Sequence, residues 1–231
     1  SSEAAKHPQS PRATYDLART LVIMTRYEAD SPFNGEALRS LDLARQSPRN
    51  GILPDQASLI FSARTGAPMP DAWWEDLQGK LRRLPVGPQE LSAIAALTDC
   101  AVAKKCAFPH EQMLATFDAA ASHGPNPEVM NMRGNYVLNV LGDSVQTLRL
   151  WQQAVALRPA ERQYHISLIK LLIVLHRYDE ARAQIAALRG IGRLGENEAE
   201  AQSLEALMRD SMQRKAAAAP SPQQQPPAQG R

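Results

Sequence analysis

The sequence predicts an all-α fold, an α-solenoid of antiparallel helix pairs that ends in a C-terminal capping helix. The first indication is a recurrence of about 34 residues, the length of a repeat built from two helices and a turn. The second is that prolines and glycines divide the chain into short helical patterns, without any strand-like run of alternating β-branched residues. The recurring sets are Met113, Thr147 and Ala181; Phe117, Trp151 and Ile185; Ala120, Ala154 and Leu188; and Pro125 with Pro159.

The predicted solenoid occupies residues 13–215 of the 231-residue chain as five helix pairs and a last helix. Residues 1–12 and 216–231 are rich in Pro, Ser, Gln and Ala and contain almost nothing to bury. We therefore expect a disordered linker before the solenoid and a disordered tail after it. The chain begins with Ser1 rather than methionine, which indicates a piece of a longer protein.

The first two pairs are the most irregular. In the first pair, residues 29–35 lengthen the turn at a position where repeats tolerate insertions. The second pair, residues 55–84, contains the adjacent Trp73 and Trp74. Neighbouring residues on a helix point about 100° apart, so at most one of the two can lie at the centre of the core face. The first pair is predicted from Tyr15, Ala18 and Leu21 in one helix and from Ala37, Leu41 and Ala44 in the other.

The third pair begins with a predicted helix at about 89–104 and contains both cysteines, Cys100 and Cys106. Six residues rotate a helical side chain by about 240°, so the sulfur atoms can meet only if the helix stops near Lys104, as Pro109 favours. In an oxidising compartment this spacing favours a disulfide, whereas in a reducing one the cysteines would be unpaired thiols or a redox pair. Without a trio of His, Asp or Cys, they do not form a metal site.

The last two pairs follow the repeat most closely. Gly142 and Asp143 form the turn inside the pair that spans 127–157, and His176 takes the place of the turn glycine in the next pair. We interpret the final helix, about 196–215, as the cap that a solenoid needs, rather than as a partner-binding helix. Its apolar side is predicted to contain Ala199, Leu204, Leu207 and Met208.

Composition and motifs argue against several function classes. The formal net charge is +2 with both signs interspersed, so we expect no nucleic-acid partner. The longest apolar run, residues 166–175, is too short for a membrane span, which needs roughly 20 apolar residues. The sequence contains no recognisable catalytic, metal-binding or cofactor-binding motif, and we interpret all five histidines as structural or solvated.

One helix offers candidate binding residues. Three asparagines recur every four residues in the first helix of the 127–157 pair, so they would form one stripe. Asparagine is an indifferent helix former, and on a concave solenoid face its amide can pair with the backbone of an extended peptide. The alternative is that Asn135 packs at the small-residue position of the repeat and bonds to a loop. The candidate groove residues are Asn131, Arg133, Asn135, Tyr136, Asn139 and Lys170.

The sequences GDSVQTLRLWQQAVALRP and HRYDEARAQIAALR resemble tetratricopeptide repeats, strongly over about 127–190 and weakly over 13–48 and 89–125. Other segments, among them ILPDQASLIFSARTG, DAWWEDLQGKLR and LTDCAVAKKCAFP, are similar to the C-terminal soluble region of multi-spanning bacterial inner-membrane proteins with such repeats. Several of those proteins resemble glycosyltransferases. The resemblance implies a periplasmic location, with any catalysis in a membrane part outside this chain, and it agrees with a disulfide.

We therefore expect a protein–protein interaction or scaffold module, the periplasmic repeat domain of a larger membrane protein of glycan or envelope assembly. The expected partner is a protein or peptide, or the membrane part of the same polypeptide, and no cofactor is expected. The alternative is a free-standing cytoplasmic adapter or co-chaperone that binds peptide tails. The two hypotheses differ in the redox state of the cysteines, because a cytoplasmic protein would keep both thiols unpaired.

Overall fold

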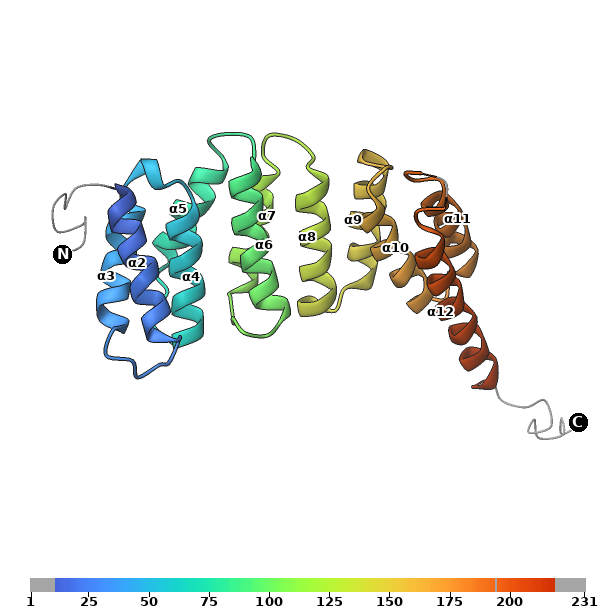
Figure 1. The fold of residues 1–231 in the computed structure, drawn as a ribbon, viewed down its shortest axis with the longest axis horizontal. Coiled ribbons are helices and arrows are strands. Elements are labelled where there is room, and N and C mark those ends of the chain that lie inside the picture. The colour runs from blue at the N-terminus through green and yellow to red at the C-terminus, as the bar shows by residue number, and fades with distance from the viewer. Residues whose placement is uncertain (1–10, 194, 219–231) are drawn as a thin grey trace, which may run out of the picture. The chain divides into compact units, whose positions relative to one another are not determined.

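The computed structural model describes residues 11–193 and 195–218, and every regular element in them is a helix (Figure 1). The predicted all-α class is confirmed, and the ten described α-helices before the last one agree in number with five pairs. None of the described helices is long and apolar enough to cross a membrane. In chain order the elements are α2 (Pro11–Thr25), α3 (Asn34–Arg45), a 3₁₀ turn η1 (Pro48–Asn50), α4 (Leu53–Thr65), α5 (Asp71–Leu81), α6 (Pro88–Val102), α7 (His110–Ala120), α8 (Pro127–Tyr136), a π-helical turn η2 (Val137–Leu141), α9 (Ser144–Leu157), α10 (Arg162–Val174), α11 (Tyr178–Arg189) and α12 (Glu198–Ala217).

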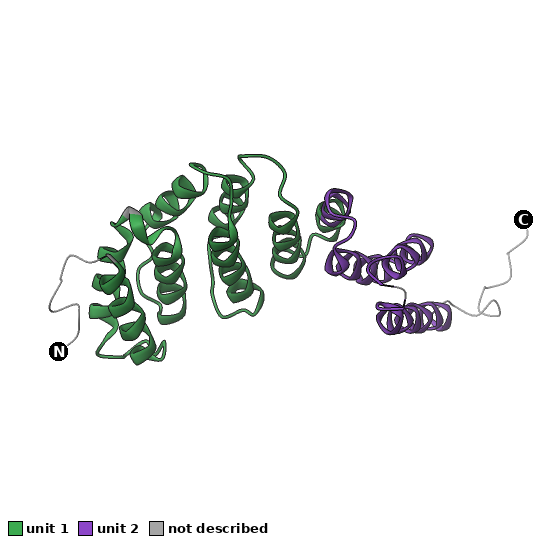
Figure 2. Cartoon of the chain, turned by 45° about the horizontal axis from the view of Figure 1, so that its top comes forward, with its two compact units in different colours: residues 1–150 green, residues 151–231 purple. Residues whose placement is uncertain are grey.

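The chain divides into two compact units, residues 1–150 and 151–231, and α9 crosses the division (Figure 2). Within the first unit, α4 packs against α6, α6 against α8, and α5 against α7. Chain neighbours such as α2 and α3, or α3 and α4, also pack together. The helices of this unit therefore pack against a chain neighbour, against the helix two places along the chain, or against both.

The second helix of each pair buries the same helical positions. In α3, α5 and α7, four buried residues recur with spacing i, i+3, i+4 and i+7, which places them on one face. They are Ala37, Ser40, Leu41 and Ala44; Trp74, Leu77, Gln78 and Leu81; and Met113, Thr116, Phe117 and Ala120. In α9 and α11 the buried set is Thr147, Trp151 and Ala154, then Ala181, Ile185 and Leu188. All nine members of the three recurring triplets in the sequence are therefore buried.

The 34-residue interval holds only from Met113 onward. Ala37, Trp74 and Met113 occupy the same position in α3, α5 and α7, but they are 37 and 39 residues apart. The connections are longer in this part of the chain: residues 46–52 join α3 to α4, whereas residues 175–177 join α10 to α11. The same helical positions are buried in every pair, but the loops differ in length. The N-terminal half of the sequence therefore lacks the regular 34-residue interval.

The second unit packs α10, α11 and α12 against one another. The final helix buries Ala201, Leu204 and Met208, whereas Ala199 and Leu207 are exposed. The predicted apolar side of this helix was therefore partly wrong, because residues spaced i, i+3 and i+7 share a face that excludes the other two. Most of the apolar residues of α10 are buried, although Val174 is 70% exposed; the buried ones are Tyr164, Ile166, Leu168, Ile169, Leu171, Leu172 and Ile173.

The turns inside the last two pairs lie at the predicted residues. Gly142 ends the η2 turn with φ 74°, a left-handed conformation that glycine adopts without strain. Asp143 then accepts a hydrogen bond from the backbone N–H of Gln146 at 2.8 Å, which caps the start of α9. His176 stands at the equivalent place between α10 and α11 and is also left-handed, with φ 58°.

The cysteines meet where α6 stops. The helix ends at Val102, and Lys104 is left-handed with φ 56°, so the chain reverses as the sequence predicts. The backbone N–H groups of Lys105 and Cys106 both donate to the carbonyl of Cys100, at 3.0 and 3.2 Å. The two cysteines lie at disulfide distance, with Cα atoms 5.3 Å apart, which is the separation that disulfides usually have.

The two tryptophans have different environments, as predicted. Trp74 is fully buried and its ring meets that of Phe108 edge to face, with centroids 5.5 Å apart. Trp73 is only partly buried, and the guanidinium of Arg45 lies over its ring, 4.9 Å from the centroid.

The ends of the helical body lie slightly outside the predicted limits. The described part of the linker, Pro11 and Arg12, belongs to α2, and the last helix continues through Ala216 and Ala217. Proline is favourable in the first helical turn and alanine is the best helix former, which explains both extensions. The predicted disorder of residues 1–10 and 219–231 lies outside the described residues.

Candidate functional site

The asparagine stripe lies on α8 and η2 in the first unit. Asn131 and Asn135 are partly exposed on α8, whereas Asn139 lies in the π-helical turn and is exposed. The side-chain amide of Asn139 donates to the backbone carbonyl of Asn135 at 2.8 Å. A π turn contains more residues than an α turn, so it interrupts the four-residue spacing on which the stripe depends. The amide of Asn139 thus bonds to the backbone of its own helical segment, as asparagine side chains often do, rather than to a partner.

Tyr136 is buried, and its prediction as a groove residue was wrong. Its side chain is fully inaccessible, and its hydroxyl is hydrogen bonded to Nδ1 of His110 at 2.7 Å. Its ring lies 5.9 Å from that of Phe117, which belongs to the core. Burial also raises the pKa of the Tyr136 phenol. The residue faces the core because the period of α8 turns it towards α7, a direction that the asparagine spacing alone did not reveal.

The two predicted cations differ in availability. Arg133 donates to Asp118 of α7 at 2.5 Å, so its charge is already compensated within the first unit. Lys170 is exposed on α10 in the second unit, where the described residues offer it no acidic partner within ion-pair distance. Asn131, Arg133, Asn135, Asn139 and Lys170 remain predicted binding residues.

A pocket that the sequence did not predict lies between α2 and α4. Its volume is about 270 Å³. Val22 is buried at its base, and Ile23 at its rim is 71% exposed. Burial raises the pKa of the Tyr15 phenol, while the nearby charge of Arg19 opposes that rise and Asp16 adds to it. The lining residues are Tyr15, Arg19, Val22, Ile23, Tyr27, Gln56, Ala57 and Ile60.

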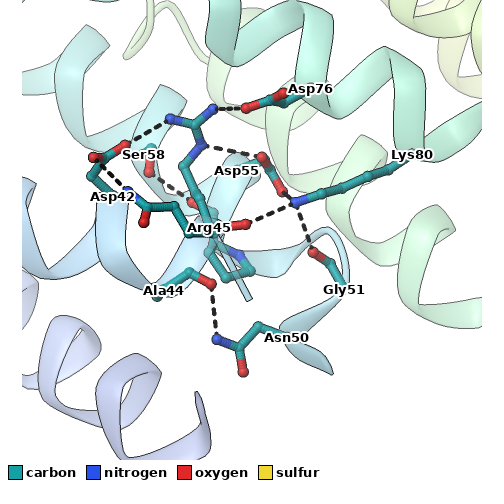
Figure 3. A network of polar contacts seen from close by, with 11 residues as sticks. Asp42, Ala44, Arg45, Asn50, Gly51, Asp55, Ser58, Asp76 and Lys80 are labelled. Atoms are coloured by element: carbon teal, nitrogen blue, oxygen red, sulfur yellow. Dashed lines mark hydrogen bonds and ion pairs between the residues drawn. The ribbon is translucent and has the colours of Figure 1, made fainter. Parts of the chain in front are cut away.

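A buried charge cluster joins α3, α4 and α5 (Figure 3). Asp55 is fully buried; its Oδ1 accepts from Arg45 Nε at 3.1 Å and its Oδ2 accepts from Lys80 Nζ at 2.6 Å. Arg45 also donates to Asp76 at 2.5 Å, and Lys80 to the carbonyl of Gly51 at 3.2 Å. Burial raises the pKa of Asp55, and the charges of Lys80 and Arg45 oppose that rise. Because cations occupy both carboxylate oxygens, the cluster connects helices and leaves neither oxygen free for chemistry.

The described histidines each have a partner within the fold. His165 is buried, with Nδ1 at 2.9 Å from Gln184 Oε1 and Nε2 at 3.0 Å from the carbonyl of Pro159. His176 Nδ1 lies 2.7 Å from the hydroxyl of Tyr178. His7 lies outside the described residues. Among the residues that the structure describes, no three His, Cys, Asp or Glu side chains gather as a metal site requires.

Comparison with known proteins finds no family model and no curated protein that matches this chain. Over the part of the chain that the structure describes, the fold and the candidate sites therefore combine helices with a recurrent burial register, a buried charge cluster and a pocket lined by α2 and α4.

Proposed function

We propose that this chain is a protein–protein interaction module of the tetratricopeptide-repeat type. The observation that carries the proposal is the recurrence of one burial register in α3, α5, α7, α9 and α11. Repeats of this kind stack on their neighbours to bury a continuous core and present extended surfaces to partners. The exposed or partly exposed polar residues of α8 in the first unit are consistent with this use, as is the exposed Lys170 of α10 in the second unit considered by itself.

We further propose that the module works on the periplasmic side of a bacterial inner membrane, as part of a larger membrane protein of glycan or envelope assembly. Two observations support the location: the disulfide distance between Cys100 and Cys106, since disulfides persist in oxidising compartments, and the resemblance of the sequence segments. The rival is a cytoplasmic adapter or co-chaperone, in which the same cysteines would be reduced.

Thiol labelling of the full-length protein in freshly lysed cells tests the location. A maleimide reagent of high mass should leave both cysteines unmodified unless a reductant is added first. Complete labelling without reductant would contradict the periplasmic proposal and favour the cytoplasmic adapter. A Cys100→Ser, Cys106→Ser variant gives the labelling signal that remains when neither cysteine is present.

A pull-down with the isolated chain tests the interaction surface. The variant Asn135→Ala, Asn139→Ala, Lys170→Ala should recover less of the partner that the unmodified chain captures. The matched control is Gln152→Ala, Gln153→Ala, Lys105→Ala, which also removes two exposed amides and one lysine. Equal recovery by all three proteins would exclude the asparagine surface. Circular dichroism must first show that each variant retains its helix content.

A further inference from the structure

The pocket between α2 and α4 has a partly apolar lining that an apolar side chain of a partner can contact. Its volume of about 270 Å³ is below the range of pockets that hold drug-sized ligands or cofactors, roughly 300–1,000 Å³. Val22, Ala57 and Ile60 provide apolar walls, and the side chain of Ile23 stands 71% exposed at the rim. Apolar side chains of this kind gain free energy when another apolar group covers them, in proportion to the area removed from water.

The pocket is elongated along α2. Tyr15 and Ile23, which both line it, are separated by about 12 Å of helix at 1.5 Å per residue. An extended peptide covers that distance with about four residues. Tyr27, which follows α2, lines the same pocket, and its ring lies 6.1 Å from that of Phe61 of α4. The surface therefore matches a short extended segment better than a compact small molecule.

The charges beside the pocket are cationic. Arg19 lines it, and the guanidinium of Arg64 lies over the ring of Tyr27, 3.7 Å from the centroid. Neither arginine forms an ion pair with an acidic side chain among the residues that the structure describes. The acidic residue of α4, Asp55, is buried in the cluster with Arg45 and Lys80, so it does not neutralise them. Asp16 is the acidic side chain of α2 closest in sequence to Tyr15, and its charge acts on that phenol.

We propose that this pocket binds an extended, acidic segment of a partner protein, which inserts one Leu, Ile, Met or Phe side chain between α2 and α4. Side-chain carboxylates on either side of that residue pair with Arg19 and Arg64. The inference rests on the proposed role as an interaction module, but it concerns different helices from the asparagine surface. Buried apolar contact supplies affinity here, and the two arginines select the sign of charge.

Fluorescence anisotropy with a labelled hexapeptide, Glu-Asp-Phe-Leu-Asp-Glu with both ends blocked, tests the proposal. We expect it to bind about tenfold more tightly than a peptide with Ala-Ala at the centre, and about tenfold more tightly than one with lysines in place of the acids. Added salt should weaken the binding, since exposed ion pairs are screened. Absence of binding at about 1 mM peptide, or equal binding of all three peptides, would overturn the proposal.

Charge reversal assigns the binding to the pocket. The variant Arg19→Glu, Arg64→Glu should no longer bind the acidic peptide and should bind the lysine peptide more tightly. The variant Ile23→Glu should bind neither peptide. The exposed Arg83→Glu and Leu84→Glu, which lie between α5 and α6, are matched controls and should bind as the unmodified chain does. If the controls weaken binding as much as the pocket variants, the proposal is wrong.

Two outcomes separate this proposal from its rivals. Concentration-dependent dimerisation that Ile23→Glu abolishes, measured by sedimentation, would assign the pocket to a second copy of this chain and overturn the peptide proposal. If the pull-down identifies a partner that binds equally well after the pocket is mutated, the pocket proposal fails while the module role stands. If thiol labelling places the chain in the cytoplasm, the location fails and the pocket proposal is unaffected.

Discussion

At the scale of single residues, Asp55 shows how this fold tolerates buried charge. Arg45 and Lys80 both pair with the carboxylate of Asp55, which leaves one positive charge in excess. The more exposed Asp42 and Asp76 compensate it by pairing with Arg45. A buried ion pair gains little net stability, because desolvation of the charges offsets their attraction. Removal of one partner is costly, however, since it leaves the others buried without compensation.

The variant Asp55→Asn should therefore lower the free energy of unfolding by about 3–5 kcal/mol, as broken buried pairs do. Urea denaturation followed by circular dichroism measures the loss. Asp42→Asn is the matched control: it removes the same charge from the same arginine, but its side chain is 53% exposed, so we expect a cost of about 1 kcal/mol or less. Equal losses for the two variants would show that the cluster contributes no more than a surface ion pair.

A second residue-scale prediction concerns acid sensitivity in the second unit. The hydrogen bonds from Arg189 and Gln202 lower the pKa of Glu198. A lowered folded-state pKa means that the interaction stabilises the protein above the unfolded pKa of about 4.3 and is lost as the pH falls through the folded value. Thermal melts should show Glu198→Gln below the unmodified chain at pH 7 and equal to it near pH 3. Glu200→Gln, two residues along the helix and therefore on another side of α12, should melt like the unmodified chain at pH 7.

At the scale of elements, helix ends depend on a few residues in the left-handed conformation. Gly142 adopts it at no steric cost, while Lys104 and His176 adopt it despite their side chains. At His176, the hydrogen bond between its ring and the hydroxyl of Tyr178 helps to hold the turn. Turn geometry is thus kept between the last two pairs even though the residue type changes.

Glycine substitutions test this distinction. Gly142→Ala should destabilise the protein by about 1 kcal/mol, because an added Cβ meets no neighbour but the backbone is left-handed. Gly79→Ala should stabilise it by about 0.5–1 kcal/mol, since that glycine lies inside α5, also with open space around an added Cβ. Chemical denaturation measures both changes. Opposite signs are expected, and the same sign for both would refute the argument from backbone conformation.

At the scale of the whole molecule, the described chain divides into two compact units, and each contains buried apolar residues. In helical arrays, stability is approximately a sum of local terms and nearest-neighbour terms, so damage need not spread through the chain. The fully buried Trp74 is a central residue of the larger core in the first unit.

Hydrogen exchange can measure how far such damage spreads. Trp74→Ala should cost about 3–5 kcal/mol and raise amide exchange in α4 to α7. Exchange in α10 to α12 should stay unchanged. Trp73→Ala, at the partly exposed neighbouring ring, should raise exchange less. Uniform acceleration over all helices would instead indicate a single cooperative unit.

Much of the fold could be predicted from the sequence because it follows from local, periodic patterns. The helix pairs, the burial of the three triplets and the stop of α6 before Cys106 all depend on residues within a few turns of one another. Hydrophobic spacing encodes which face of a helix is buried, and Gly and Pro encode where it ends. The asparagine stripe was the weaker prediction, since the π turn at Val137–Leu141 has no clear sequence signal.

The sequence by itself thus determined the all-α class, and it predicted five helix pairs with a last helix and a stop of the third pair's first helix that lets the two cysteines meet. Only the tertiary structure decided that Asp55 pairs with Lys80, that Tyr136 faces the core, and that α2 and α4 enclose a pocket. The physical reason is that periodicity fixes the direction of a side chain relative to its own helix. Which groups that side chain meets depends on loop lengths and helix packing, and those vary along this chain while the burial register does not.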